Sequence, residues 1–214
     1  MVMEPLALAD FWDLLPVAAL DWPPLPSNAM VTDTNDGLDY AIARGVRRWS
    51  GSVSVALSSL ANGAEIDAII GGLSVPGASF WVSPLHRPRP ASVANPAAGA
   101  RIGWRSVDGS QVSFGALVVG DSLRRGEFFS YVTPDGRARL HCLLGSVTAG
   151  VGGVTGPVGV SPALDPSAIL SQWVRLDRPQ VIAKIVPQSI KSGDFLPTWH
   201  GGVSFAWRES RWTV

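Results

Sequence analysis

Three histidines and one cysteine are the residues of this 214-residue chain best suited to metal or nucleophilic chemistry. His141 and Cys142 are adjacent in a predicted strand, so they point to opposite faces and cannot bind one metal ion together. No CxxC or HExxH spacing accompanies them. We therefore expect structural or surface roles for His86, His141 and His200, and the sequence predicts no metal site.

The acidic residues Glu65 and Asp67 are a candidate pair for acid–base catalysis. They lie two residues apart in a predicted helix, so their side chains diverge. They also fall in its first turn, where the helix dipole favours carboxylates. This position explains both residues without a catalytic role.

Two stretches approach known catalytic or cofactor motifs. The run GVGGVTG at 150–156 resembles a dinucleotide-binding fingerprint, but its last glycine comes one place late and no helix is predicted to follow. The stretch Gly202–Ala206 resembles a nucleophile elbow, but alternation places Ser204 inside a strand rather than at a sharp turn. The sequence therefore predicts no catalytic residue, no cofactor and no enzyme activity.

The composition is that of a folded domain without net charge. The chain is 46% hydrophobic and 16% charged, which suits a sizeable core and argues against disorder. A net charge of zero argues against a protein whose main task is gripping nucleic acid, and it suits a subunit that packs against its own copies. The acidic N-terminus and the interrupted apolar stretches predict neither a signal peptide nor a membrane span, so we expect a soluble protein made in a cytoplasm.

The elements that would position any site are mostly strands. Residues 1–30, with DWPPLP at 21–26, predict an extended proline-rich arm that lies against its own domain or a neighbour. Residues 31–214 predict a single β-sandwich domain with a proline-rich loop at 83–96. Asn35-Asp36-Gly37 predicts a turn.

The stretch RRWSGSVSVALSS at 47–59 alternates with a period of two, which is typical of a half-buried strand. Trp49, Val53, Val55 and Leu57 share one side, and the other side is a candidate lumen or subunit-seam face formed by Ser50, Ser52, Ser54 and Ser58. The period then changes to that of a short helix. Asn62 and Glu65 resemble a capping box, and the apolar stripe of the helix is Ile66, Ile69, Ile70 and Leu73.

The rest of the chain predicts further strands. GEFFSYV at 126–132 and RLHCLL at 139–144 predict a hairpin whose turn contains Pro134-Asp135-Gly136. The glycine-rich run 145–164 predicts a flexible or tightly turning segment. Other strands are expected at 78–82, 103–107, 112–119, 173–176, 181–186 and 203–207. The predicted class is mainly β, a sandwich or barrel-like layer pair with one short flanking α-helix.

This order of elements resembles the distal tail proteins of long-tailed bacteriophages and related gene transfer agents. The likeness covers roughly residues 46–210, with its matching pieces at Gly126–Phe129, Leu140-His141, Arg178-Pro179 and Val203–Glu209. It implies a β-sandwich of the tail-tube type. It also implies a virion protein of the tail tip, assembled in the host cytoplasm without contact to a membrane.

The resemblance implies a structural role with defined partners. Distal tail proteins form a ring, commonly a hexamer, that joins the tail-tube protein to the central hub protein and lets DNA pass without sequence-specific binding. The serine face would then line the lumen or a seam, with a solvent-facing strand as the alternative. Two other functions stay open: a tail-tube subunit, and a carbohydrate-binding β-sandwich that uses exposed tryptophans on the host surface.

Overall fold

A computed structural model describes residues 4–23, 29–33, 39–43, 47–56, 59–193 and 202–210 of the chain. Within these ranges the protein is mainly β with a single α-helix, α1 (Leu60–Leu73), which confirms the predicted fold class. The strands are β1 (Val17–Asp21), β2 (Ala29–Asp33), β3 (Asp39–Ala43), β4 (Ser50–Val55), β5 (Phe80–Val82), β6 (Ala100–Arg105), β7 (Gln111–Gly115), β8 (Ser122–Leu123), β9 (Phe128–Val132), β10 (Ala138–Leu143), β11 (Val147–Thr148), β12 (Val158–Ser161), β13 (Trp173–Val174), β14 (Val181–Ile185) and β15 (Ser204–Glu209). Three 3-10 turns are η1 (Trp12–Leu14), η2 (Pro96–Ala98) and η3 (Val151–Gly153).

The first sheet has five antiparallel strands in the order β1-β4-β15-β14-β5. Strand β4 pairs with β1 on one side and with β15, more than 140 residues later, on the other. At the β5 edge, Leu6 adds a short parallel bridge: its N–H donates to Ser79 O at 2.9 Å and its carbonyl accepts from Trp81 N at 3.0 Å. This bridge covers part of an edge that would otherwise offer unpaired backbone groups.

Helix α1 packs its apolar side against this sheet, and Ile66, Ile70 and Leu73 are buried in the first hydrophobic core. The helix begins two residues before the expected capping box. Ser59, rather than Asn62, is the N-cap, because its hydroxyl accepts a hydrogen bond from the backbone N–H of Asn62 at 3.4 Å.

Residues 4–23 lie against their own domain, one of the two positions expected for the N-terminal arm, but they form packed elements of the fold rather than an extended arm. Residues 17–21 form strand β1 of the first sheet, and Phe11, Trp12 and Leu15 are buried in the first core. The ring of Phe11 meets Phe80 edge-on at 5.0 Å between centroids. The prolines had suggested an irregular segment, but burying these large side chains outweighs the cost of ordering it.

The second sheet is a closed six-stranded barrel in the order β13-β6-β7-β12-β10-β9. It closes where Ser130 of β9 and Arg175, which follows β13, exchange two backbone hydrogen bonds of 3.0 and 2.7 Å. Closure leaves the barrel without free edges. The predicted hairpin is confirmed as β9 and β10, joined by a turn in which Gly136 has a φ of 79°.

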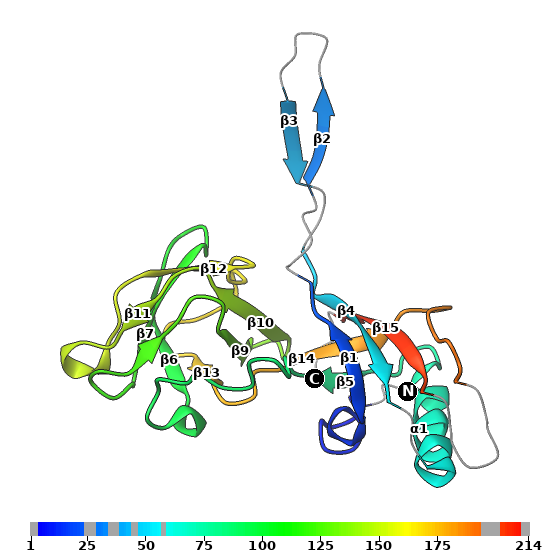
Figure 1. Cartoon of the computed structure of the whole chain (residues 1–214). Helices are drawn as coiled ribbons and strands as arrows, with labels where there is room; N and C mark the ends of the chain where they lie inside the picture. Colours follow the sequence, from blue (N-terminus) through cyan, green and yellow to red (C-terminus); the bar gives the residue numbers. More distant parts are fainter. Residues whose placement is uncertain are drawn as a thin grey trace.

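The barrel is inserted into the first sheet, so the described residues have two hydrophobic cores rather than the single one that was expected. The chain leaves the first sheet at Val82 and returns at Val181, and all barrel strands lie between these residues. Figure 1 shows the barrel in green and yellow beside the first sheet and its helix. The glycine-rich run at 145–164 is also more ordered than predicted, because β12 within it is an inner strand of the barrel.

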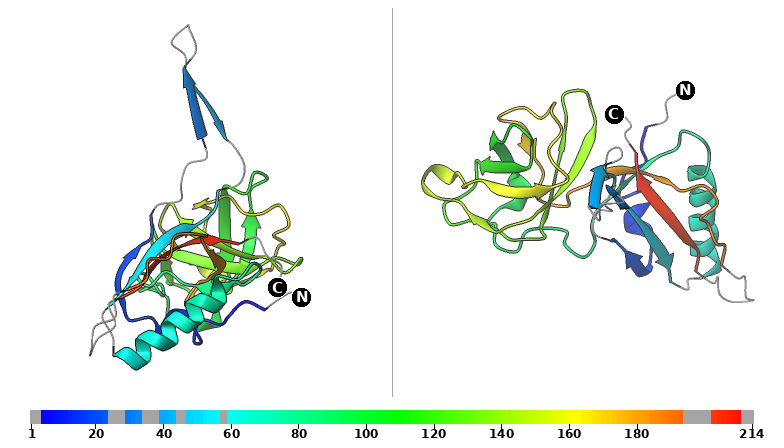
Figure 2. Two further views of the ribbon diagram at one scale, coloured as in Figure 1. Left: turned by 90° about the vertical axis from the view of Figure 1, so that its right-hand side faces the viewer. Right: turned by 90° about the horizontal axis from the view of Figure 1, so that it is seen from above.

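Strands β2 and β3 form a separate two-stranded sheet with five residue pairs, from Ala29↔Ala43 to Asp33↔Asp39. Figure 1 and the left view of Figure 2 show this hairpin standing away from both the first sheet and the barrel. The turn predicted at Asn35–Gly37 lies outside the described residues.

Candidate functional site

The candidate site is the outer face of the first sheet, where strand β4 carries the serines. Trp49, Val53 and Val55 are buried in the first core, whereas Ser52 and Ser54 are exposed and Ser50 is half-buried. The structure therefore brings these three serines together on one face. Ser58, the fourth candidate, lies outside the described residues.

The strands on either side continue this face with mostly small residues. On β15, Ser54 pairs with Ser204 and Ser52 pairs with Ala206. On β1, Ala19 is the partner of Ser54. The pairing partners that carry charge are Asp21 beside Ser52, and Arg208 beside Ser50, with Lys184 of β14 next to Arg208. The face thus carries mostly short side chains, and its cations, Arg208 and Lys184, lie at one end.

The first sheet and the barrel meet in a cluster of aromatic rings. Trp22, which follows β1, lies 4.6 Å from Trp207 of β15 and 6.2 Å from Phe128 of β9, measured between centroids. Trp49 and His86 each lie 5.6 Å from the same Phe128 ring. Because Phe128 belongs to the barrel and the other rings to the first sheet or its connections, this contact fixes the two parts against each other.

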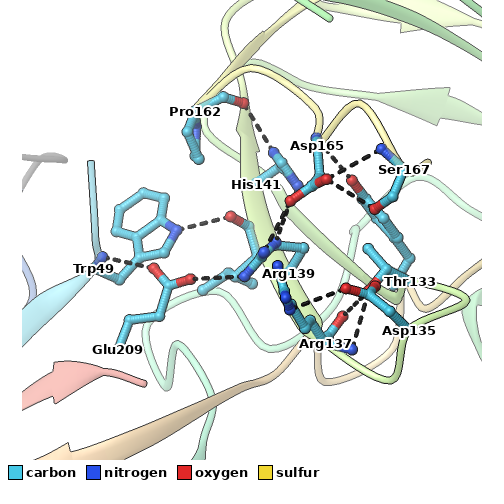
Figure 3. Close-up of polar contacts among 12 residues, drawn as sticks. Trp49, Thr133, Asp135, Arg137, Arg139, His141, Pro162, Asp165, Ser167 and Glu209 are labelled. Atoms are coloured by element: carbon cyan, nitrogen blue, oxygen red, sulfur yellow. Dashed lines mark hydrogen bonds and ion pairs between the residues drawn. The ribbon is translucent and has the colours of Figure 1, made fainter. Parts of the chain in front are cut away.

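A network of ion pairs and hydrogen bonds around the buried Arg139 includes Trp49 of this ring cluster (Figure 3). Arg139 of β10 donates to Asp165 at 2.8 Å within the barrel and lies 3.9 Å from Glu209 at the end of β15. Glu209 also accepts a hydrogen bond from Trp49 N at 2.9 Å, and the indole of Trp49 donates to Leu140 O at 2.8 Å. Burial raises the pKa of Asp165, but hydrogen bonds from Ser167 and Arg139 outweigh this effect and hold it at about 2.

His141 is a buried structural residue of the barrel. Its ring stacks on Phe129 and Tyr131 at 5.2 and 5.3 Å, and its Nδ1 lies 2.8 Å from the carbonyl oxygen of Pro162. A carbonyl can only accept, so Nδ1 carries the proton and donates. Burial lowers the pKa of His141 to about 4, and the positive charge of Arg139 adds to the effect.

Acidification from pH 7 to pH 4 will therefore destabilise the fold. The unfolded chain binds a proton at His141 near pH 6.5, whereas the folded chain does so only near pH 4, so stability falls between these values by roughly 3 kcal/mol. Asp165 adds to the loss from about pH 5 downward, because its carboxyl is half protonated at pH 3.8 in the unfolded chain but only at about pH 2 in the folded chain. Urea midpoints at pH 7, 5 and 4 measure the loss.

The matched variants are His141→Gln and His86→Gln. His86 has a pKa lowered by partial burial and by Arg87, so its replacement removes a smaller part of the pH dependence. We expect the urea midpoint of His141→Gln to change less between pH 6.5 and pH 4 than that of the wild type. An unchanged slope in this variant would show that another group titrates there.

The remaining candidates for chemistry are dispersed. Cys142 faces the first core while His141 faces the barrel interior, as the alternation predicted. Ser204 lies within β15, and the GVGGVTG run at 150–156 contains the 3-10 turn η3. Among the described residues no three histidine, cysteine or acidic side chains come close enough to hold a metal ion. His200 lies outside these residues.

Sequence reasoning missed the network of Arg139, Asp165 and Glu209. A signal was present, because Arg139 lies in a predicted strand whose other residues are mostly apolar, where a charge needs a buried partner. The identity of that partner was not accessible, since Glu209 is 70 residues away.

In the part of the chain that the structure describes, no helix has the length and apolar character needed to cross a membrane. A scan against protein-family models and a search of curated proteins found no match to this sequence.

Proposed function

We propose that the chain is a structural subunit of a phage tail tip, which assembles with its own copies into a ring between the tail tube and the central hub. The observation that carries the proposal is the projecting hairpin β2–β3. A two-stranded hairpin alone is marginally stable in water, so a formed hairpin away from the body needs a partner surface. A neighbouring subunit supplies one.

The serine face fits the same proposal. Away from the end that carries Arg208 and Lys184, small hydroxyl and methyl groups on β4 and β15 leave a surface that neither binds DNA strongly nor obstructs it. The absence of net charge lets copies approach without repulsion. We assign this face to the lumen or to a seam between subunits.

Replacing residues 29–43 with a short Gly-Ser loop will abolish assembly and leave the body folded. The reason is that β2 and β3 pair with each other and with no strand of the two larger sheets. Light scattering over a concentration series measures the mass, and negative stain shows whether rings form. The expected result is a discrete mass of several subunits for the wild type and a monomer for the variant.

A suitable control is Val107→Asp, which changes a fully exposed side chain on the barrel and should assemble like the wild type. Rings that persist in the loop variant would exclude the hairpin as the assembly element. Wild-type rings that stack into long tubes would instead indicate a tail-tube subunit.

Exposed tryptophans favour a second candidate, the binding of a host carbohydrate. Trp104 and Trp173 are 45% and 43% exposed on the neighbouring strands β6 and β13, and the Arg175 guanidinium lies 5.8 Å from the Trp173 ring centroid. Aromatic faces with a nearby polar group suit the stacking of a sugar. A saturable change in tryptophan fluorescence with host polysaccharide, lost in Trp104→Ala or Trp173→Ala, would support this function over the ring.

A further inference from the structure

The end of the barrel farthest from the first sheet carries an exposed apolar tip. Two loops form it, residues 116–120 after β7 and residues 150–154 after β11. Val151 is 96% exposed, and three more valines are about half exposed or more. We call these four residues the valine tip: Val118, Val119, Val151 and Val154. No charged residue occurs in either loop.

The valine tip is held rigidly. Leu117 N donates to Gly153 O at 3.1 Å, and Gly120 N donates to Ala149 O at 2.9 Å, which ties the two loops together. The buried carboxylate of Asp121 accepts from Val118 N at 3.0 Å. Gly153 has a φ of 70°, and a Cβ there would lie 2.0 Å from Leu117 O, so the close approach depends on glycine. Ordered, exposed apolar loops of this kind mark interaction sites.

An apolar groove lies beside helix α1, at the opposite end of the molecule. Its volume is about 270 Å³, and it runs between the helix and the N-terminal segment. Of the described residues that line it, only Glu4 carries a charge. The apolar lining consists of Leu6, Ile69, Gly72, Leu73 and Ala78. Figure 1 and the right view of Figure 2 both place the loop after β11 at one extreme and α1 at the other.

We infer that the valine tip of one copy docks into the apolar groove of the next copy. The inference rests on the proposed ring and names one of its contacts. Tip and groove are different surfaces on opposite ends of one chain, so the contact is head-to-tail. Head-to-tail contacts generate rings when the rotation closes.

A second copy is the occupant that these observations favour. Both surfaces are mainly apolar, and the four valines can be buried without taking a charge of the tip itself out of water. The whole chain has no net charge, so no long-range repulsion opposes contact between copies. Because the contact is apolar, raising the salt concentration will not weaken it.

Cysteine cross-linking tests the contact directly. The double variant Gly72→Cys with Val151→Cys places one thiol at the groove and one at the tip. Position 72 is exposed, and a Cβ there meets no atom within 4 Å. Cys142→Ala in the same chain removes the native thiol. Under mild oxidation we expect a ladder of covalent oligomers that contain two, three and more chains, with at least tenfold more product than from the control pair.

The control pair is Gly72→Cys with Val107→Cys, in which the second thiol sits at an equally exposed barrel site outside the tip. Equal cross-linking in both pairs overturns the inference. If the wild type forms rings in negative stain but the tip pair gives no ladder, the inference fails and the ring stands. A ladder in a preparation that shows only open chains supports the contact and contradicts the ring. If neither a ladder nor rings are observed, the result contradicts both the tip–groove contact and the ring.

Discussion

Replacing Arg139 with methionine will lower the free energy of unfolding by about 3–5 kcal/mol. Arg139 and Glu209 are both more than 90% buried, and the guanidinium lies 2.8 Å from Asp165 and 3.9 Å from Glu209. Methionine fills a similar volume but removes the positive charge that the carboxylates of Asp165 and Glu209 face. Urea unfolding followed by tryptophan fluorescence at pH 7 measures the loss.

Two controls separate this effect from a general effect of removing arginine. Arg137→Met deletes an ion pair with Asp135 at 2.9 Å in which both side chains are about 40% exposed, and we expect a change below about 1 kcal/mol. Adding Glu209→Gln to Arg139→Met removes one of the two carboxylates that face Arg139 and keeps an acceptor for Trp49 N, so part of the stability should return. Equal losses for Arg137→Met and Arg139→Met would mean that the network contributes little.

Replacing Trp207 with alanine will destabilise the protein by about 3–5 kcal/mol, because it opens a cavity in the first core. The side chain is fully buried, with ring centroids 4.6 Å from Trp22 and 6.2 Å from Trp12. Gly51 on the facing strand leaves room for it, since a Cβ there would lie 2.9 Å from the Trp207 ring. Because Trp22 packs on both Trp207 and Phe128, removing the Trp207 ring will also weaken the contact between the first sheet and the barrel.

The matched control is Trp104→Ala, which removes the same side chain from an exposed site and should cost less than about 1 kcal/mol. Near-UV circular dichroism should lose intensity in the Trp207 variant beyond the contribution of one indole, because Trp22 loses its packing partner. Similar unfolding free energies for the two alanine variants would contradict the assignment of Trp207 to the core.

Local patterns in the sequence were sufficient for most of the strands and for the single helix. Alternation marked β4 and β15, and Pro134-Asp135-Gly136 marked the β9–β10 hairpin, because period and turn chemistry act over a few neighbouring residues. The same alternation placed three of the candidate serines on one face. The N-cap was misplaced by three residues, since both Ser59 and Asn62 can cap a helix and only the backbone geometry distinguishes them.

Pairing over long distances along the chain was decided by the tertiary structure alone. That β4 lies between β1 and β15, that residues 83–180 form a second core, and that Arg139 meets Glu209 are contacts between segments far apart in sequence. Alternation indicates which residues of a strand are buried, but it does not indicate which strand or helix they pack against, because any apolar face can pack on any other. The sequence by itself therefore determined the mainly-β class and the serine face of β4. The tertiary structure alone decided the two cores and their junction, because these depend on which apolar faces and buried charges come close in three dimensions. It also decided that the tip and the groove lie at opposite ends of the molecule.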